Sequence, residues 1–94
     1  MSKEMGYEVR PDEGIMNQFG YIFLQQKDYE RSRMFFQVNI DYYPKNFNVY
    51  DGMGDCYLAM NNKPKAIEYF KKALAIKNTR EIKEKLEKLE IEKK

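Results

Sequence analysis

A repeat of 34 residues is the feature of this sequence that most limits its fold. When residues 13–46 are aligned with residues 47–80, three identities recur: Gly20 with Gly54, Leu24 with Leu58, and Phe36 with Phe70. Apolar residues coincide at many further positions, and a shift of one residue loses the glycine and phenylalanine matches. We therefore expect two copies of one structural unit, followed by a shorter segment at 81–94.

Apolar residues within each unit follow the period of an α-helix. In the first half of each unit they are spaced i, i+3, i+7, as on one helix face: Met16, Phe19 and Phe23, then Tyr50, Met53 and Tyr57. The second halves continue the pattern with Met34, Phe35, Val38 and Tyr42, then Ile67, Phe70 and Leu74. This spacing predicts that the aromatic residues form a core rather than a platform for stacking nucleic-acid bases.

Turn and capping residues divide the chain into five helices, at about 13–26, 29–42, 47–60, 63–76 and 79–93. Asp28 and Asn62 are predicted to cap the second helix of each unit. Pro44 ends a helix, and Pro64 suits a first turn, where its missing N–H costs little. Asn61 suits the left-handed conformation of a helix end. The run NTRE at 78–81 predicts a capping box that opens the fifth helix, and residues 1–12 are expected to be an extended lead-in.

Residues 13–80 resemble the tetratricopeptide repeat, a 34-residue helix-turn-helix with bulky and small residues at set offsets. The first unit carries Met16, Phe19-Gly20, Phe23, Ser32, Phe36, Asn39 and Pro44. The second carries Tyr50, Met53-Gly54, Tyr57, Ala66, Phe70, Ala73 and Asn78. The resemblance implies an all-α fold, an α-α superhelix of two helical hairpins plus a capping helix at 81–94 with Ile82, Leu86 and Leu89 on one face.

Small residues are expected where the two helices of each hairpin cross. Gly20 should face Ser32 and Gly54 should face Ala66, since a larger side chain would force the helices apart at ~1–3 kcal/mol. Two residues depart from the family pattern. Asn39 replaces an alanine and, once buried, needs hydrogen-bond partners. Lys27 replaces the glycine that is usual at the turn.

Composition excludes several classes of function. The chain has no histidine, which removes Ser-His-Asp and Cys-His catalysis, and it has a single cysteine, Cys56, so no intrachain disulfide can form. Its net charge of +2 is small for a nucleic-acid binder. It lacks the ~18 consecutive apolar residues that a membrane span needs. We expect no enzyme activity, no cofactor, no metal site, and no nucleic-acid or membrane partner.

Several candidate sites have simpler structural explanations. Cys56 is interpreted as a structural thiol in mid-helix. Asp51 and Asp55 lie i, i+4 and could bind a cation, but two carboxylates are few for a tight site, so a solvated face is expected. The lysines at 63, 65, 71 and 72 are interleaved with core residues and indicate a solvated face. The C-terminal Glu/Lys run is too short for a stable coiled coil and indicates a capping helix.

The tetratricopeptide resemblance implies a groove lined by the first helix of each pair. Carried over by position, its residues are Asn17, Tyr21, Leu24 and Gln25 from the first unit and Asn48, Asp51, Asp55 and Leu58 from the second. Family members that hold a C-terminal carboxylate use lysine and asparagine on these helices, and here the lysines are missing from the two units. The groove is neutral to acidic, which suits a polar or mildly basic peptide.

A second resemblance covers most of the chain. The segments GYEV at 6–9, NQFGY at 17–21, NIDYYP at 39–44 and NVYDGMG at 48–54 are similar to tails attached to bacterial serine hydrolases of the esterase-like α/β-hydrolase type. This resemblance implies that a parent enzyme domain would lie upstream and that no residue here is catalytic.

The sequence thus predicts a non-catalytic module for protein–protein interaction. Its partner would be a protein or peptide, or the parent hydrolase domain in the same polypeptide. Two repeats are fewer than the ~3 units usually needed for stability, so self-association into a homo-oligomer is a further expectation. The alternatives are a small hydrolase-associated protein and an RNA-binding helical repeat protein.

Overall fold

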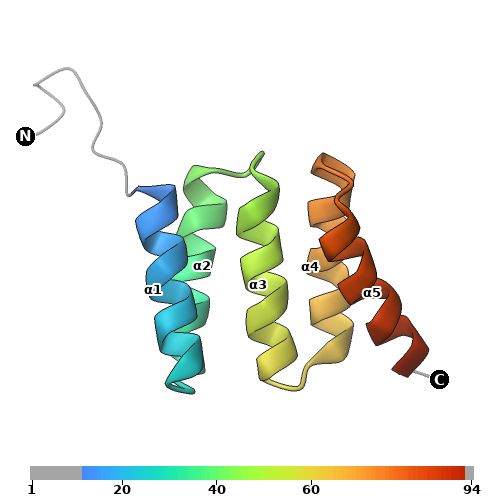
Figure 1. Cartoon of the computed structure of the whole chain (residues 1–94). Helices are drawn as coiled ribbons and strands as arrows, with labels where there is room; N and C mark the ends of the chain where they lie inside the picture. The colour runs from blue at the N-terminus through green and yellow to red at the C-terminus, as the bar shows by residue number, and fades with distance from the viewer. Residues whose placement is uncertain (1–11, 93–94) are drawn as a thin grey trace, which may run out of the picture.

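A computed structural model describes residues 12–92 of the chain, so residues 1–11 of the expected lead-in lie outside the described residues. Within this range five helices follow one another side by side (Figure 1). Their bounds are α1 Glu13–Gln25, α2 Tyr29–Tyr42, α3 Phe47–Ala59, α4 Lys63–Ile76 and α5 Arg80–Glu92. The predicted all-α fold is confirmed, and every predicted helix end is right to within one residue.

The two hairpins, α1–α2 and α3–α4, are closed by the same turn. Lys27 and Asn61 both adopt the left-handed conformation, with φ of 64° and 63°. In the first turn the Asp28 N–H donates to the Phe23 carbonyl at 2.9 Å, and in the second the Asn62 N–H donates to the Tyr57 carbonyl at 2.8 Å. This is the Schellman pattern of a helix end. The lysine therefore takes the conformation that glycine takes in the family pattern.

Side chains cap the helices largely as predicted. Asp28 accepts from the Arg31 N–H and Asn62 from the Lys65 N–H, each at 3.3 Å. The capping box predicted to begin at Asn78 is wrong by one residue. Thr79 caps α5, since its hydroxyl accepts from the Ile82 N–H at 3.3 Å and the helix begins at Arg80.

Phe36 holds the first hairpin against the second. Its ring is fully buried between Gly20 on α1 and Gly52 on α3. A Cβ atom built on Gly20 would lie 2.6 Å from this ring, and one on Gly52 would lie 2.5 Å from it. Ser32 also meets Gly20 as predicted, because its hydroxyl donates to the Gly20 carbonyl at 2.8 Å. The close approach of α1, α2 and α3 thus depends on two glycines and one ring.

Phe70 has the same place one repeat later. The ring lies 2.6 Å from a Cβ built on Gly54, so it is Phe70 rather than Ala66 that first meets this glycine. Around Phe70 the core continues into α5, where the predicted face is confirmed: Ile82, Leu86 and Leu89 are all buried.

The fifth helix takes the place of the first helix of a third unit. Its buried residue Leu86 stands 34 residues after Gly52, and both pack on the phenylalanine of the preceding unit. The outward side of α5 is different, since Glu84 and Lys88 are exposed where the equivalent α3 residues, Tyr50 and Gly54, pack on α4. This charged side makes α5 a cap.

Asn39, the polar departure from the family pattern, is fully buried in α2. Its amide donates to the Glu13 carbonyl at 3.1 Å, so one of its polar groups has the partner that burial requires.

Three residues predicted to be core are exposed. Phe19 is 42% exposed, Met34 52% and Tyr42 45%. Phe19 packs on Phe35 of α2 through one side of its ring only, with ring centroids 5.5 Å apart, and this partial contact leaves the rest of the side chain exposed.

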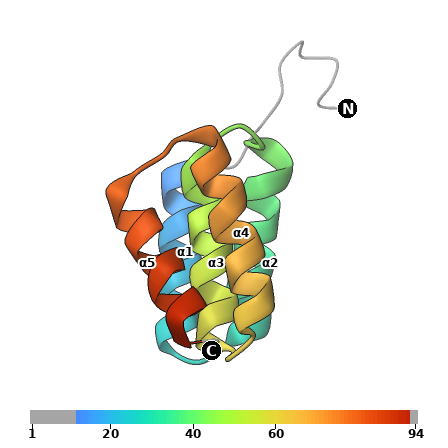
Figure 2. The ribbon, with the colours of Figure 1, turned by 90° about the vertical axis from the view of Figure 1, so that its right-hand side faces the viewer.

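The helices form two layers. Figure 2 shows α1, α3 and α5 toward one side and α2 and α4 toward the other. Residues far apart in sequence therefore meet along the face that α1, α3 and α5 share, which we call the first-helix face. Within residues 12–92, none of the helices has the length and apolar character that a membrane span requires.

Candidate functional site

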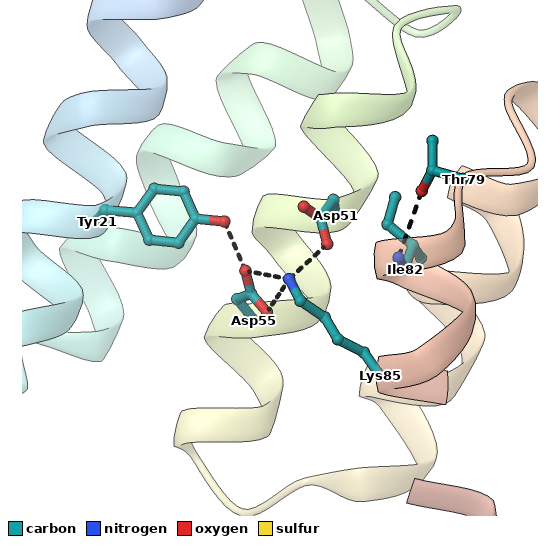
Figure 3. Close-up of polar contacts among 6 residues, drawn as sticks. All are labelled: Tyr21, Asp51, Asp55, Thr79, Ile82 and Lys85. Atoms are coloured by element: carbon teal, nitrogen blue, oxygen red, sulfur yellow. Dashed lines mark hydrogen bonds and ion pairs between the residues drawn. The ribbon is translucent and has the colours of Figure 1, made fainter. Parts of the chain in front are cut away.

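The first-helix face carries a polar cluster of four side chains that come from three helices (Figure 3). Tyr21 lies on α1, Asp51 and Asp55 on α3, and Lys85 on α5. The Tyr21 hydroxyl donates to Asp55 Oδ2 at 2.5 Å, and Lys85 Nζ donates to Asp51 Oδ1 at 3.1 Å. Each of these pairs is separated by 34 residues. The cluster therefore follows from the repeat, since equivalent positions on α1, α3 and α5 lie next to one another.

One ammonium serves two carboxylates in this cluster. Lys85 Nζ also lies 3.2 Å from both oxygens of Asp55. The three side chains are mostly covered, with 32% of Lys85, 20% of Asp51 and 19% of Asp55 exposed. The expectation that Asp51 and Asp55 form a solvated face is wrong, because α5 packs across them and its lysine lies between them.

Burial and an excess of negative charge shift the protonation of the cluster. Burial, followed by the charge of Asp55, raises the pKa of the Asp51 carboxyl, and Lys85 only partly opposes this. Burial and Asp55 also raise the pKa of the Tyr21 hydroxyl far above its usual value. Burial alone would lower the pKa of Lys85, but the attraction of Asp55 and Asp51 outweighs it and raises this pKa. The cluster thus consists of a neutral tyrosine, one cation and two carboxylates.

A hollow of about 270 Å³ opens beside the cluster, between α3 and α5. Leu58 and Leu89 supply its apolar lining, and Asp55, Lys85 and Lys88 supply charged groups. Such a combination of apolar wall and few polar groups is typical of sites that accept a side chain of a ligand.

The structure brings together three of the eight predicted groove residues, Tyr21, Asp51 and Asp55. Asn17 lies at the α1–α3 contact, where its Oδ1 is 3.2 Å from a Cβ built on Gly52. Leu24 and Leu58 are half-buried against the two core clusters. Gln25 and Asn48 are exposed, near the end of α1 and the start of α3, and stay apart from the polar cluster.

Lys85, Lys88 and Leu89 belong to this face, although sequence reasoning assigned α5 to a cap alone. The signal that could have found two of them is the period itself. Adding 34 to Asp51 gives Lys85, and adding 34 to Asp55 gives Leu89. The first helices of the two units carry no lysine, as expected, but α5 adds Lys85 to the same face, where its ammonium pairs with two carboxylates.

Cys56 is fully buried, with its Sγ 3.9 Å from the Tyr29 carbonyl. Burial raises the pKa of this thiol, which keeps it in the unreactive protonated form. Its surroundings fit the interpretation of a structural thiol.

The polar cluster predicts that the protein loses stability in alkali. The folded chain holds the Tyr21 proton to higher pH than the unfolded chain, whose tyrosines titrate at about pH 10. The folded state then binds more protons above that pH, so the free energy of unfolding falls as pH rises, by up to ~1.4 kcal/mol per pH unit from this one group. The raised pKa of Lys85 adds a loss of the same sign at still higher pH. Urea titrations between pH 9 and pH 11 measure this fall.

Tyr21→Phe should make that fall shallower, although not abolish it, because burial also raises the pKa of Tyr69. Tyr42→Phe is the matched control, since Tyr42 is 45% exposed. An unchanged slope in the Tyr21→Phe variant contradicts the proposed contribution of this hydroxyl.

Comparisons with known proteins agree with this architecture. Residues 47–80 match the model of the tetratricopeptide repeat family, the same bounds that were predicted for the second unit. A search of curated proteins gave no match. Neither this family match nor the structural match described next concerns a hydrolase, so attachment to a hydrolase domain stays a prediction.

Among solved structures, the N-terminal domain of stress-induced protein-1 (STI-1) from C. elegans is similar in fold. The two share 14% sequence identity with a TM-score of 0.73, over 84% of this chain and 68% of that one. At this identity the likeness concerns the fold alone. The chain therefore has an all-α helical-repeat fold of the tetratricopeptide type, with residues 47–80 matching the family's own repeat.

Proposed function

We propose that the first-helix face binds a short peptide that presents a basic side chain next to an apolar one. The observation that carries this proposal is that two mostly covered carboxylates, Asp51 and Asp55, share the single ammonium of Lys85. Lys88 also lines the neighbouring hollow, but within residues 12–92 it forms no ion pair with either carboxylate, so two carboxylates share one paired cation where water screens charge poorly. A second cation, supplied by a ligand, is therefore favoured at this place.

The hollow between α3 and α5 supplies the apolar part of the site. Leu58 and Leu89 line it within the same small space as Asp55, so one ligand segment can reach both. An apolar side chain in this hollow would provide binding energy through burial, and the neighbouring charge would select its sequence context. A helical-repeat scaffold suits this role because it holds the residues on rigid helices. No catalytic step is part of the proposal.

Short peptides that differ at one residue test the chemistry of the site. Three otherwise identical peptides place a lysine, a glutamine or a glutamate next to a leucine, and fluorescence polarisation measures their dissociation constants. We expect the lysine peptide to bind about tenfold more tightly than the glutamine peptide and the glutamate peptide most weakly. Equal binding of all three contradicts the proposal.

Asp51→Asn should remove most of the preference for lysine over glutamine. This variant keeps a polar side chain of the same shape and leaves Lys85 paired with Asp55. Asp41→Asn is the matched control, because Asp41 is an exposed aspartate on α2 that accepts a hydrogen bond from the Gln37 amide at 3.1 Å. Loss of the preference in the control would place the peptide elsewhere.

A single-stranded RNA oligonucleotide serves as a probe for the alternative function. The small net charge of +2 predicts no tight binding. Tight binding that weakens steeply with salt would favour the nucleic-acid alternative over a peptide partner.

A further inference from the structure

The outward side of α1 exposes three large apolar side chains in a single row. Ile15 is 51% exposed, Phe19 42% and Ile22 45%, and their spacing of four and three residues places them on one side of the helix. We call these three residues the α1 row. Half-exposed Ile and Phe side chains gathered in this way are typical of a surface that another element covers.

The repeat provides an internal reference for what should cover the α1 row. The residues 34 positions later are Val49, Met53 and Cys56, and all three are fully buried. Met53 and Cys56 are buried against α2, since Phe36 belongs to the same core cluster and the Tyr29 carbonyl lies 3.9 Å from Cys56 Sγ. The α1 row has the same place on its own helix, yet its side chains stay 42–51% exposed, although one side of the Phe19 ring packs on Phe35 of α2 with ring centroids 5.5 Å apart.

We propose that a second copy of this chain covers the α1 row, with the two α1 helices antiparallel about a two-fold axis that passes near Phe19. The row reads almost the same in both directions along the helix. In an antiparallel pair Phe19 meets its own symmetry mate, and Ile15 of one copy meets Ile22 of the other. A two-fold interface requires this self-complementarity. The inference is independent of the peptide site, which lies on a different side of α1.

The charges around the α1 row have the same symmetry. Asp12 precedes the helix and Lys27 follows it, and Glu13 is the sole charged residue between them. Antiparallel pairing brings Asp12 of each copy toward Lys27 of the other, so the favourable pair occurs twice. It also places the dipoles of the two α1 helices antiparallel, an arrangement in which they attract one another. A core without charges and a rim with opposite charges are the usual composition of an interface.

Sedimentation equilibrium of the full chain over a range of concentrations tests the proposal. We expect a mass that rises with concentration toward twice the 11.4 kDa of one chain. Ile15→Glu and Ile22→Glu should each raise the dissociation constant by about tenfold or more, because every substitution enters the interface twice. Met34→Glu is the matched control, since Met34 is 52% exposed on α2, away from the α1 row, and should leave the dimer intact.

Two outcomes overturn the proposal. A monomer at every concentration means that no second copy covers the row. A dimer that survives both glutamate variants uses some other surface. Circular dichroism of each variant confirms that a monomeric result does not come from unfolding.

Disulfide cross-linking tests the antiparallel orientation. Ile15→Cys and Ile22→Cys chains, mixed and mildly oxidised, should form several-fold more cross-linked dimer than either variant alone. The native Cys56 is fully buried and serves as a common background. Preferential cross-linking of each variant with itself would mean a parallel pair and would overturn the proposed symmetry.

Discussion

Replacing Phe36 by alanine is expected to lower the free energy of unfolding by about 3–5 kcal/mol, the usual cost of removing a buried phenylalanine. The ring is fully buried and touches α1 at Gly20 and α3 at Gly52. Neither of the two glycines that face the ring has a side chain to fill the space. Small domains are stable by only about 5–15 kcal/mol, so this one change removes a large share. Urea denaturation followed by circular dichroism measures it.

Met34→Ala is the control for this prediction. Met34 lies two residues earlier on the same helix but is 52% exposed, so its truncation should change stability by less than about 0.5 kcal/mol. A loss of under about 1 kcal/mol in the Phe36→Ala variant, below the range for buried phenylalanines, would mean that the two hairpins do not depend on this ring.

Gly52→Val should destabilise the protein by about 3 kcal/mol, toward the upper end of overpacking costs. Glycine is a poor helix former, so in an open helix position the substitution would be neutral or favourable. Here a Cβ atom would lie 2.5 Å from Cε1 of Phe36 and 3.2 Å from Oδ1 of Asn17. Phe36 has little room to move aside, because Gly20 on α1 lies against the same Cδ1–Cε1 edge of its ring. The steric overlap therefore lowers the stability of the variant, whereas the better helix propensity of valine would by itself raise it.

Gly14→Val provides the matched comparison on α1. Gly14 is exposed, and a Cβ there would meet only the Asp12 carboxylate, at 3.3 Å. We expect its free energy of unfolding to stay within about 0.5 kcal/mol of the parent, as is usual for surface substitutions. Thermal melts of both variants make the comparison. A Gly52→Val protein as stable as Gly14→Val would disprove the tight crossing of α2 and α3.

Helix positions were predictable because their signals are local. The 34-residue period, together with Asp28, Asn62 and Pro64, places the helix starts within one residue. The cap of α5 shows the limit of such signals. Asn78 and Thr79 are both good capping residues, and only the path of the chain from α4 to α5 selects Thr79.

The role of Gly52 illustrates a different limit. Its counterpart in the first unit is Gln18 and its counterpart in α5 is Leu86, so no repeated glycine marks the position. The need for a small residue arises between units, where Phe36 crosses to α3. A pattern read within one unit cannot show that contact.

The polar cluster was half predictable. Carrying the family's groove positions onto this sequence selected Tyr21, Asp51 and Asp55, which the structure joins. It did not select Lys85, since α5 was treated as a cap outside the repeat. Lys85 reaches Asp51 and Asp55 because α5 lies next to α3. That placement can be predicted only if α5 is aligned as the first helix of a third unit.

The exposure of Phe19 has a similar origin. Its equivalent, Met53, is fully buried because a preceding hairpin covers it. A repeat pattern predicts which side of a helix is apolar, but burial also requires a neighbour on that side. The first helix of an array has none within the array.

The charged outward side of α5 determines where this scaffold can be lengthened. Glu84, Glu87 and Lys88 stand where α1 and α3 carry the apolar and glycine residues on which a second helix packs. A duplicated 34-residue unit placed after α5 would bury those charges. The same unit inserted between α4 and α5 would meet Phe70 on one side and the apolar row of Ile82, Leu86 and Leu89 on the other. Longer versions of this protein, natural or engineered, should therefore gain their additional units internally and keep α5 as their last helix.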